Sequence, residues 1–320
     1  MTASRDVLIH SVGEPLPSVF DTLGSLFRVT RDPDPRARGI AVSGGHARVD
    51  AAFAARFPAL EIVANSGVGY DHIDAAALAT RGIVVTNTPD VLTEEVADLA
   101  LGLLLATVRR LPQADRHVRA GLWLKGTFPL TPTLRGRTVG ILGLGRIGKA
   151  IARRLEGFGV AIEYHGRDEQ AGVPYRYRAT VLDLAKSCDV LMITVPGGAE
   201  TRQLVRHETL EALGPNGILI NVARGSVVDE AALIRALQDR TILAAGLDAF
   251  ADEPRVPEAL LAMDHVVLLP HVGSGSEHTR QAMGRLMIDN LVSWFDVQRP
   301  LTPVPECARL VSRTTNHAGR

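Results

Sequence analysis

The sequence of 320 residues contains only two cysteines, few aromatic residues and no excess of either charge. Cys188 and Cys307 lie far apart and lack the spacing of metal ligands, so we expect neither a disulfide framework nor a metal site. Free thiols are typical of a reducing compartment and indicate a cytoplasmic protein. Lysine plus arginine and aspartate plus glutamate number 35 each, and the basic residues are scattered. Neither nucleic acid nor a membrane is therefore an expected partner.

Long apolar runs are also missing. The longest, from Leu99 to Val108, is too short to span a bilayer and is bounded by Asp98 and Arg109. The first ten residues show no apolar core followed by a small-residue cleavage site, so we expect no secretory leader. Hydrophobic residues make up 46% and charged residues 22%, which is typical of a globular protein of about two domains.

Short β-branched runs alternate along the chain with helical patterns, which is typical of parallel α/β folds. Before residue 100, strands are expected at 7–10, 39–43, 61–64 and 83–86, and helices at 51–57 and 74–80. A long helix is expected from about Thr93 to Arg110, closed by Pro112. A second series has strands at 139–142, 160–164, 190–195, 218–222, 244–247 and 266–269, and a last helix at about 276–295. About six parallel strands suit a complete doubly wound dinucleotide domain.

The turn after the expected strand 139–142 carries Gly143, Gly145 and Gly148 in the spacing Gly-x-Gly-x-x-Gly. The first glycine permits a tight turn, the second lets a pyrophosphate approach the backbone, and the third lets the helix pack closely on the strand. Backbone N–H groups at the helix start, around Arg146 and Ile147, would receive the phosphates. A plain glycine-rich turn is the alternative for the motif alone, but downstream residues fit the same chemistry. We therefore predict a nicotinamide dinucleotide site.

The end of the second strand of this domain indicates which dinucleotide binds. Domains specific for NAD usually carry an acidic residue there, about 20 residues after the glycines, on the ribose 2′-hydroxyl. This sequence has His165 at that position, followed by Gly166 and Arg167, while Glu163 lies two residues earlier. The missing acid at this position and the nearby guanidinium suit a 2′-phosphate. NADPH is favoured over NADH, and a solvated loop charge at Arg167 is the alternative.

Three polar segments, 221–226, 248–254 and 269–274, follow expected strands in the second half. Carboxyl ends of parallel strands line the ligand crevice of open α/β sheets. Reduction of a ketone needs a hydride donor, a proton donor and a cation that orients an acidic substrate. His271 can supply the proton, Glu253 can favour the charged imidazole, and Arg224 can bind a carboxylate. Each residue taken alone is more often structural or exposed than catalytic.

Taken in order, these motifs resemble the D-isomer-specific 2-hydroxyacid dehydrogenases over nearly the whole chain. The matching segments are 65–74, 143–148, 221–229, 248–254 and 270–274. The segment 164–167 and the short length resemble the glyoxylate/hydroxypyruvate reductase branch. The resemblance implies a Rossmann doubly wound parallel-sheet domain at 100–287, inserted in a smaller flavodoxin-like α/β substrate-binding domain at 1–99 and 288–320. It also implies a homodimer.

The resemblance implies a role for each matched residue. His271 corresponds to the general acid/base, Glu253 to its carboxylate partner, and Arg224 to the ligand of the substrate carboxylate and carbonyl. Backbone N–H groups of the loop Ser66, Gly67, Val68 and Gly69 are implied to hold the substrate carboxylate. Further residues expected at the cofactor are Thr93, Val195, Pro196, Val222, Ala223 and Asp248.

The predicted activity is NADPH-dependent reduction of glyoxylate or hydroxypyruvate to the D-2-hydroxy acid. The run from Val195 to Gly198 replaces the Pro-Leu-Thr run that is usual in the family. Its two glycines are interpreted either as a wider or looser wall on the cofactor side or as a tolerated loop variant. Within the enzyme class, the alternative substrate is a bulkier 2-keto acid of the phenylpyruvate or 2-ketoaldonate type. From another class, the alternative is a dinucleotide-sensing, corepressor-like binding protein.

Overall fold

The computed structural model describes residues 5–44 and 48–310. The chain forms two compact units: a discontinuous unit, Met1–Leu92 with Ser276–Arg320, and a central unit, Thr93–Gly275. The expected boundaries at 99/100 and 287/288 fall inside helices α4 (Thr93–Val108) and α11 (Glu277–Val297). A helix buries one continuous apolar face, so each of these helices belongs wholly to one unit and the divisions fall where they begin.

Among the described residues of the discontinuous unit, five parallel strands form the sheet. They are β1 (Arg5–Gly13), β2 (Phe27–Thr30), β3 (Gly39–Ser43), β4 (Ile62–Ser66) and β5 (Val84–Thr86), in the order β2-β1-β3-β4-β5. This is the flavodoxin-like order, which confirms the predicted class of this part. Helix α1 (Pro17–Leu26) and β2 were not predicted from the sequence patterns, because the strand follows the helix without an intervening loop or turn signal.

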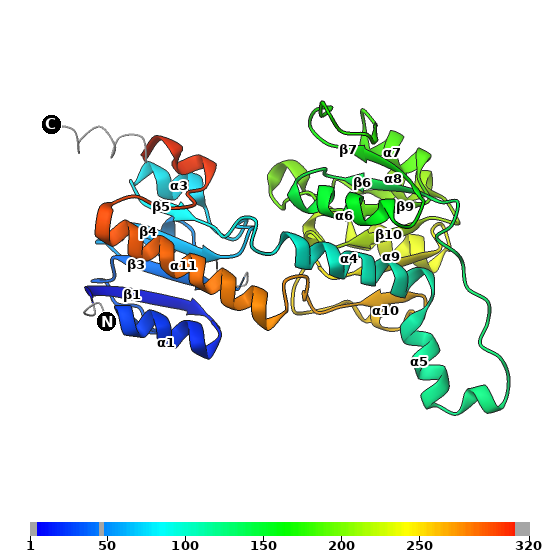
Figure 1. Ribbon diagram of the computed structural model, residues 1–320, viewed down its shortest axis with the longest axis horizontal. Helices are drawn as coiled ribbons and strands as arrows, with labels where there is room; N and C mark the ends of the chain where they lie inside the picture. The colour runs from blue at the N-terminus through cyan, green and yellow to red at the C-terminus, as the bar shows by residue number, and fades with distance from the viewer. Residues whose placement is uncertain (1–4, 45–47, 311–320) are drawn as a thin grey trace. The chain divides into compact units, whose positions relative to one another are not determined.

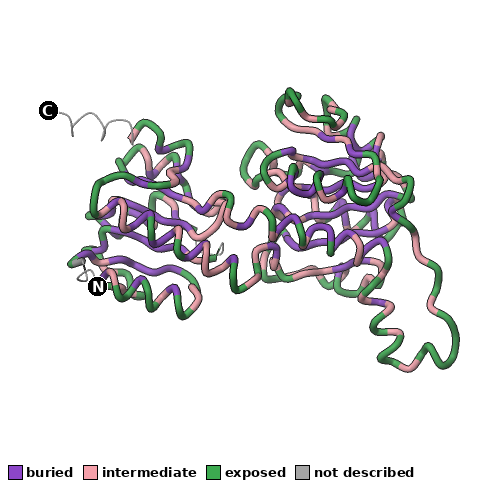
Figure 2. The backbone as a smooth tube through the Cα atoms, viewed as in Figure 1, coloured by how far each residue is buried: buried purple, intermediate pink, exposed green. Residues whose placement is uncertain are grey.

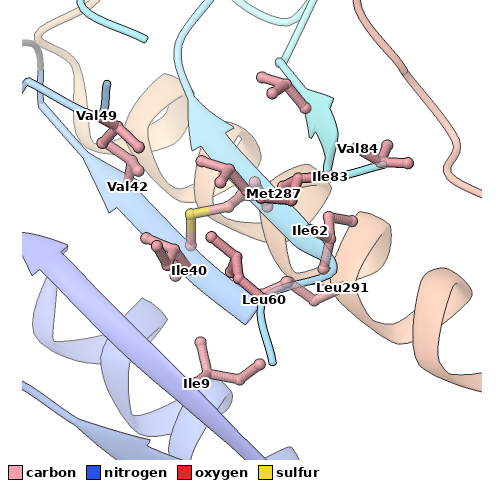
Figure 3. Packing of buried hydrophobic residues seen from close by; sticks show 14 of the residues in the cluster. Ile9, Ile40, Val42, Val49, Leu60, Ile62, Ile83, Val84, Met287 and Leu291 are labelled. Carbon is pink, nitrogen blue, oxygen red and sulfur yellow. The ribbon is translucent and has the colours of Figure 1, made fainter. Parts of the chain in front are cut away.

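Helices α1 and α11 pack against each other and against the sheet of this unit (Figure 1). The unit also contains the short helices α2 (Ala51–Ala54) and α3 (Ala75–Thr80). Helices α1 and α11 approach closely, since a β-carbon on Gly284 would lie 2.4 Å from a methyl of Val19. Figure 3 shows branched side chains of several strands meeting α11 in the core. Ile40, Ile62 and Leu291 have no exposed surface, so burial of this apolar face holds α11 on the sheet.

Seven parallel strands, one more than expected, form the sheet of the central unit. They are β6 (Thr138–Leu142), β7 (Ala161–His165), β8 (Arg176–Tyr177), β9 (Val190–Ile193), β10 (Ile218–Asn221), β11 (Ala244–Leu247) and β12 (Val266–Leu268). The order β12-β11-β10-β9-β6-β7-β8 contains the Rossmann order, with the reversal between β6 and β9. The predicted fold class is confirmed. The additional strand, β8, has two residues and no recognisable pattern.

Helices cover both faces of the central sheet. Helices α4 and α6 (Arg146–Glu156) pack on one face, and α7 (Val181–Ser187), α8 (His207–Leu213) and α9 (Glu230–Gln238) pack on the other. Within β9, Val190 and Met192 belong to the first core layer, and Leu191 and Ile193 to the second. Side chains alternate between faces along a strand, so a strand buried on both faces is apolar throughout.

The long helix expected to reach Arg110 ends as α4 at Val108. Arg110 has a left-handed backbone, with φ of 52°, and Pro112 lies in the first turn of the next helix instead of closing the previous one. This helix, α5 (Leu111–Arg119), leads into η1 (Leu122–Leu124) and an extended return to β6. In Figures 1 and 2 this segment loops away from the sheet of its own unit and is largely exposed. We call residues 111–135 the arm.

The remaining short helices are η2 (Ala199–Thr201), η3 (Gly225–Val227), α10 (Glu258–Leu261) and η4 (Pro305–Cys307). Within residues 5–44 and 48–310, no helix is long and apolar enough to cross a membrane.

Candidate active site

The glycine turn between β6 and α6 is shaped by close packing on two sides. Gly143 has φ of 101°, and a β-carbon there would lie 2.7 Å from a methyl of Val195. A β-carbon on Gly148 would lie 2.2 Å from the carbonyl oxygen of Gly143, so any side chain would push α6 off the turn. At Gly145, by contrast, nothing lies within 4 Å of a β-carbon. The open side at Gly145 leaves room for a phosphate at the start of α6, with Arg146 and Ile147 in its first turn.

The carboxylate of Glu163, in the middle of β7, is already hydrogen-bonded to other side chains. Arg178 donates to both carboxylate oxygens, at 2.6 and 2.9 Å, and the Ser187 hydroxyl donates at 2.5 Å. Burial tends to raise the pKa of Glu163, but the bonds from Arg178 and Ser187 prevail and the pKa is lowered. The Nδ1 atom of His165 lies 2.8 Å from the carbonyl oxygen of Arg178. Glu163 is therefore bound to this strand's own neighbours and is not available to a ribose hydroxyl.

Beyond His165 the chain passes through Gly166, whose carbonyl accepts a bond from the Tyr177 hydroxyl at 3.3 Å. Arg167 is exposed and makes no ion pair with any described carboxylate. Its guanidinium is the cation that this strand end offers to an anionic group.

The ring of His271 is held by Glu253. The Nδ1 atom of His271 lies 2.7 Å from Oε2 of Glu253, and Oε1 accepts the backbone N–H of Phe250 at 2.9 Å. Burial tends to raise the pKa of Glu253, but these hydrogen bonds and the charges of His271 and Arg224 prevail and lower it. An ionised carboxylate that accepts from Nδ1 leaves Nε2 as the ring nitrogen for chemistry.

A second carboxylate positions the backbone around His271, which has φ of 54°. Asp248, only 2% exposed, accepts the N–H of Val272 and of Gly273, each at 2.8 Å. Burial raises the pKa of Asp248, and the two N–H bonds oppose this only in part. Sequence reasoning places Asp248 near the nicotinamide; the structure shows that both of its oxygens hold the turn that carries the histidine.

The loop of Arg224 is shaped by Asn221 and packs on the loop of Glu253. Asn221 accepts the N–H of Ala223 and donates to the carbonyl of Arg224, both at 3.0 Å. A β-carbon on Gly225 would lie 1.9 Å from the carbonyl carbon of Phe250, so only glycine allows this approach. Glu230, the first residue of α9, secures the neighbouring loop by accepting the N–H of Ala251 at 3.0 Å. Sequence reasoning missed the role of Glu230, because no local signal links it to residue 251.

The remaining expected cofactor residues also occupy the carboxyl edge of the central sheet or α4. Val195 and Pro196 follow β9, Val222 and Ala223 follow β10, and Thr93 is the first residue of α4. The glycine turn, His165, Arg224, Asp248 and His271 likewise lie at or just beyond strand ends. This edge is the ligand-binding side of such sheets.

In the discontinuous unit, the carbonyl groups of the loop after β4 point toward two side-chain amides and accept hydrogen bonds from them. Asn65 donates to the carbonyls of Gly67 and Gly69, both at 3.1 Å, and Asn87 donates to that of Val68 at 2.9 Å. In a trans peptide the carbonyl and the next N–H point in opposite directions. The N–H groups of Val68, Gly69 and Tyr70 therefore point away from the amides, and none of them donates to a described residue. Successive unpaired N–H groups form an anion-binding concavity.

No group of three or more histidine, cysteine, aspartate or glutamate side chains within 5–44 and 48–310 is placed to hold a metal ion. The chemistry that this part of the chain offers is proton transfer at His271, anion binding by Arg224 and by the loop after β4, and phosphate binding at the glycine turn.

Comparison with known proteins agrees with this geometry. The family model described as D-isomer specific 2-hydroxyacid dehydrogenase, NAD binding domain, matches residues 101–273. Glyoxylate/hydroxypyruvate reductase A HPR2 of Arabidopsis thaliana is 49% identical over 82% of this chain and 84% of its own length. Hydroxyphenylpyruvate reductase of Plectranthus scutellarioides is 46% identical over the same shares.

A solved structure shows the same fold. The NADPH-dependent glyoxylate/hydroxypyruvate reductase of Sinorhizobium meliloti, in complex with NADP and malonate, superposes with a TM-score of 0.91. It is 52% identical in sequence, and the match covers 95% of this chain and 98% of that one. The resemblance seen in the motifs is confirmed: the chain belongs to the D-isomer-specific 2-hydroxyacid dehydrogenase family.

Proposed function

We propose that this protein catalyses the NADPH-dependent reduction of a small 2-keto acid, glyoxylate or hydroxypyruvate, to the D-2-hydroxy acid. The observation that carries the proposal is the bond between His271 and Glu253, in the unit that also holds the glycine turn and the Arg224 loop. Relatives named as reductases of these keto acids, at 49% and 52% identity, support the substrate class.

Each of these residues has a separate role in the proposed reaction. A bound nicotinamide dinucleotide supplies the hydride that the carbonyl carbon accepts. His271 holds the proton at Nε2 and gives it to the carbonyl oxygen, while ionised Glu253 stabilises the cationic ring and fixes its orientation. Arg224 orients the substrate through its carboxylate and carbonyl oxygens. The N–H groups of the loop 67–70 bind the carboxylate, so the discontinuous unit serves as the substrate-binding domain.

The preference for NADPH rests on the end of β7. Glu163 is engaged by Arg178 and Ser187, and Arg167 is exposed without a carboxylate partner among the described residues. A 2′-phosphate gains a charge-assisted partner from Arg167, whereas the engaged carboxylate of Glu163 is not free to bind a 2′-hydroxyl. The relative from Sinorhizobium meliloti is NADPH-dependent, in agreement with this reading.

A bulkier aromatic 2-keto acid is the second candidate substrate. It is favoured by the 46% identity with hydroxyphenylpyruvate reductase. The chemistry would be the same, because His271, Glu253 and Arg224 act on the keto acid moiety and not on its side chain.

The first experiment is to follow nicotinamide absorbance with purified protein, pairing NADPH and NADH with glyoxylate, hydroxypyruvate and 4-hydroxyphenylpyruvate. We expect fastest oxidation of NADPH with one of the two small acids. Faster turnover of the aromatic acid would select the second candidate. Tight cofactor binding without turnover of any of the three would refute the reductase and favour a dinucleotide sensor.

We further propose that the protein is a cytoplasmic homodimer joined through the arm. Six exposed large apolar residues lie on this segment: Leu111, Val118, Leu122, Trp123, Leu124 and Leu130. Such a patch marks an interaction surface. A cavity of about 540 Å³ lies at the base of the arm, lined in part by Leu130, Pro132 and Met263. Protruding apolar side chains and a hollow on one surface suit an isologous pairing of two copies. Two buried free thiols support a reducing compartment.

A further inference from the structure

The loop 67–70 is connected to α11 by a continuous series of hydrogen bonds through residues distant in sequence. We propose that Asn87, Thr302 and Asn290 are positioning residues for the carboxylate-binding loop, and that they set the affinity for the substrate carboxylate. We call these three residues the relay. The inference rests on the proposed role of the loop and adds three residues to it.

Asn87 links the loop to the rest of the relay. Its side chain donates to the carbonyl of Val68 at 2.9 Å. Its backbone is bonded twice to one residue: its N–H donates to the carbonyl of Thr302 at 3.2 Å, and its carbonyl accepts the Thr302 hydroxyl at 2.6 Å. These two bonds fix the position of the Asn87 backbone. The side-chain amide that reaches Val68 is thereby fixed as well.

Thr302 is in turn held by Asn290 of α11, which has no exposed surface. Asn290 donates to the Thr302 hydroxyl at 2.9 Å and to the carbonyl of Leu286 at 2.8 Å, and its carbonyl oxygen accepts the N–H groups of Leu301 and Thr302 at 2.9 and 3.0 Å. Both donors and both acceptor positions of the amide are used. A buried and fully bonded amide has one orientation, so it fixes the direction of the Thr302 hydroxyl.

The effect on the loop follows from peptide geometry. The bond from Asn87 holds the Val68 carbonyl inward, and the N–H of Gly69 therefore points outward. Asn65 holds the two flanking carbonyls, and the N–H of Thr88 also donates to that of Gly67 at 3.0 Å. Among the described residues, the Val68 carbonyl is held by Asn87 alone. Loss of the Asn87 bond would let the Val68–Gly69 peptide rotate. The central N–H of the anion site would then be lost while the fold remains.

The test compares Asn87→Ala, Thr302→Val and the double variant with the wild type. Thr302→Val keeps the side-chain shape and removes the hydroxyl, and Thr302→Ser restores it. Ser293→Ala is the matched control, because its hydroxyl bonds the Arg299 carbonyl at 2.6 Å in the same region but outside the relay. We measure KM and kcat for glyoxylate and hydroxypyruvate, the Kd for NADPH, and the Kd for malonate with saturating NADP by calorimetry.

Each single variant should raise KM and the malonate Kd by roughly tenfold, the value of about one hydrogen bond, with little change in kcat or NADPH affinity. Thr302→Ser and Ser293→Ala should behave like the wild type. Since Thr302 acts through Asn87, the double variant should be no worse than Asn87→Ala. Additive losses, or equal losses of keto acid and NADPH affinity, would overturn the relay.

The readouts separate the relay from the proposed reaction. A wild type that binds malonate but reduces none of the keto acids would refute the reductase, and the malonate affinities of the variants would still decide on the relay. A wild type that binds no malonate in the presence of NADP would overturn the anion-binding loop and the relay with it. If Thr302→Val fails to fold, Asn87→Ala decides alone, because it leaves the backbone bonds to Thr302 in place.

Discussion

The Nδ1 atom of His271 lies 2.7 Å from Oε2 of Glu253, in a segment whose backbone is held by Asp248. One carboxylate thus orients the ring and the other holds the turn that carries it. The pKa values of the two acids shift in opposite directions, since that of Glu253 is lowered and that of Asp248 is raised by its burial.

Replacing His271 by alanine should abolish most turnover, by about 10² to 10⁴-fold in kcat, because the proton donor is lost. NADPH affinity should change little, since the phosphates bind at the glycine turn. Glu253→Gln should cause a smaller loss, because an amide can still orient the ring but cannot stabilise its positive charge. Steady-state kinetics with fluorescence titration of NADPH check both. Near-wild-type rates for His271→Ala would remove the histidine from the mechanism.

Asp248→Asn should impair catalysis by displacing the histidine. An amide offers one acceptor atom for the two N–H groups of Val272 and Gly273, and its NH₂ group would face one of them. We expect lower kcat and lower melting temperature together, because a buried N–H is left without a partner. A fall in kcat without any fall in melting temperature would indicate that Asp248 acts on the ligand and not on the turn.

Arg167→Ala should weaken NADPH by roughly tenfold to a hundredfold, the value of a charge-assisted bond to a 2′-phosphate, and leave NADH nearly unchanged. Arg176→Ala is a suitable control, because Arg176 is an exposed arginine of neighbouring β8. Titration of the two cofactors against each variant measures the difference. Equal losses for NADPH and NADH would remove Arg167 from the phosphate site.

Leu124→Asp should convert a dimer to monomers. Leu124 is 94% exposed on the arm, so an aspartate costs the isolated chain little, whereas a charge in an apolar interface is unfavourable. Light scattering coupled to size exclusion measures the mass. Leu182→Asp is the matched control, because Leu182 is an exposed leucine of α7 that lies neither on the arm nor among the residues lining the cavity. A wild type that is monomeric at micromolar concentration would contradict the proposed pairing.

Acid should destabilise the protein partly through His10. This residue is 4% exposed, its ring is stacked on Phe57 at 5.1 Å, and burial lowers its pKa below 6.5. Between that lowered pKa and 6.5 the unfolded chain binds a proton that the folded chain does not, so the free energy of unfolding falls as pH falls through this window. One such proton contributes up to about 1.4 kcal/mol per pH unit.

The variant His10→Phe keeps an apolar ring on Phe57 and should lose less stability than the wild type between pH 7 and 5. Chemical denaturation at several pH values gives the slope, and His207→Gln, at an exposed histidine of α8, is the control. Identical slopes in wild type and His10→Phe would show that His10 does not titrate in this window. His265, whose pKa is also lowered by burial, should account for part of the remaining slope.

The sequence by itself determined the elements and motifs whose signals are local. Every expected strand overlaps an observed one, because the apolar runs are bounded by turns. The glycine spacing predicted a turn that favours glycine at Gly143 and Gly148, since the positive φ of Gly143 and the approach of Gly148 to the Gly143 carbonyl are both set within the motif. The edge strands β2 and β8 were not predicted, because β2 follows α1 without a turn signal and β8 has only two residues.

Tertiary structure alone decided which distant groups meet. The sequence shows a glutamate near the end of β7, but only the fold brings Arg178 and Ser187 onto Glu163 and removes it from the ribose site. The Thr302 hydroxyl reaches the carbonyl of Asn87 across 215 positions of the chain. Such contacts depend on strand order and on the packing of helices that begin far away. No pattern of neighbouring residues encodes them, because a hydrogen bond requires two groups within about 3 Å whatever their separation in sequence.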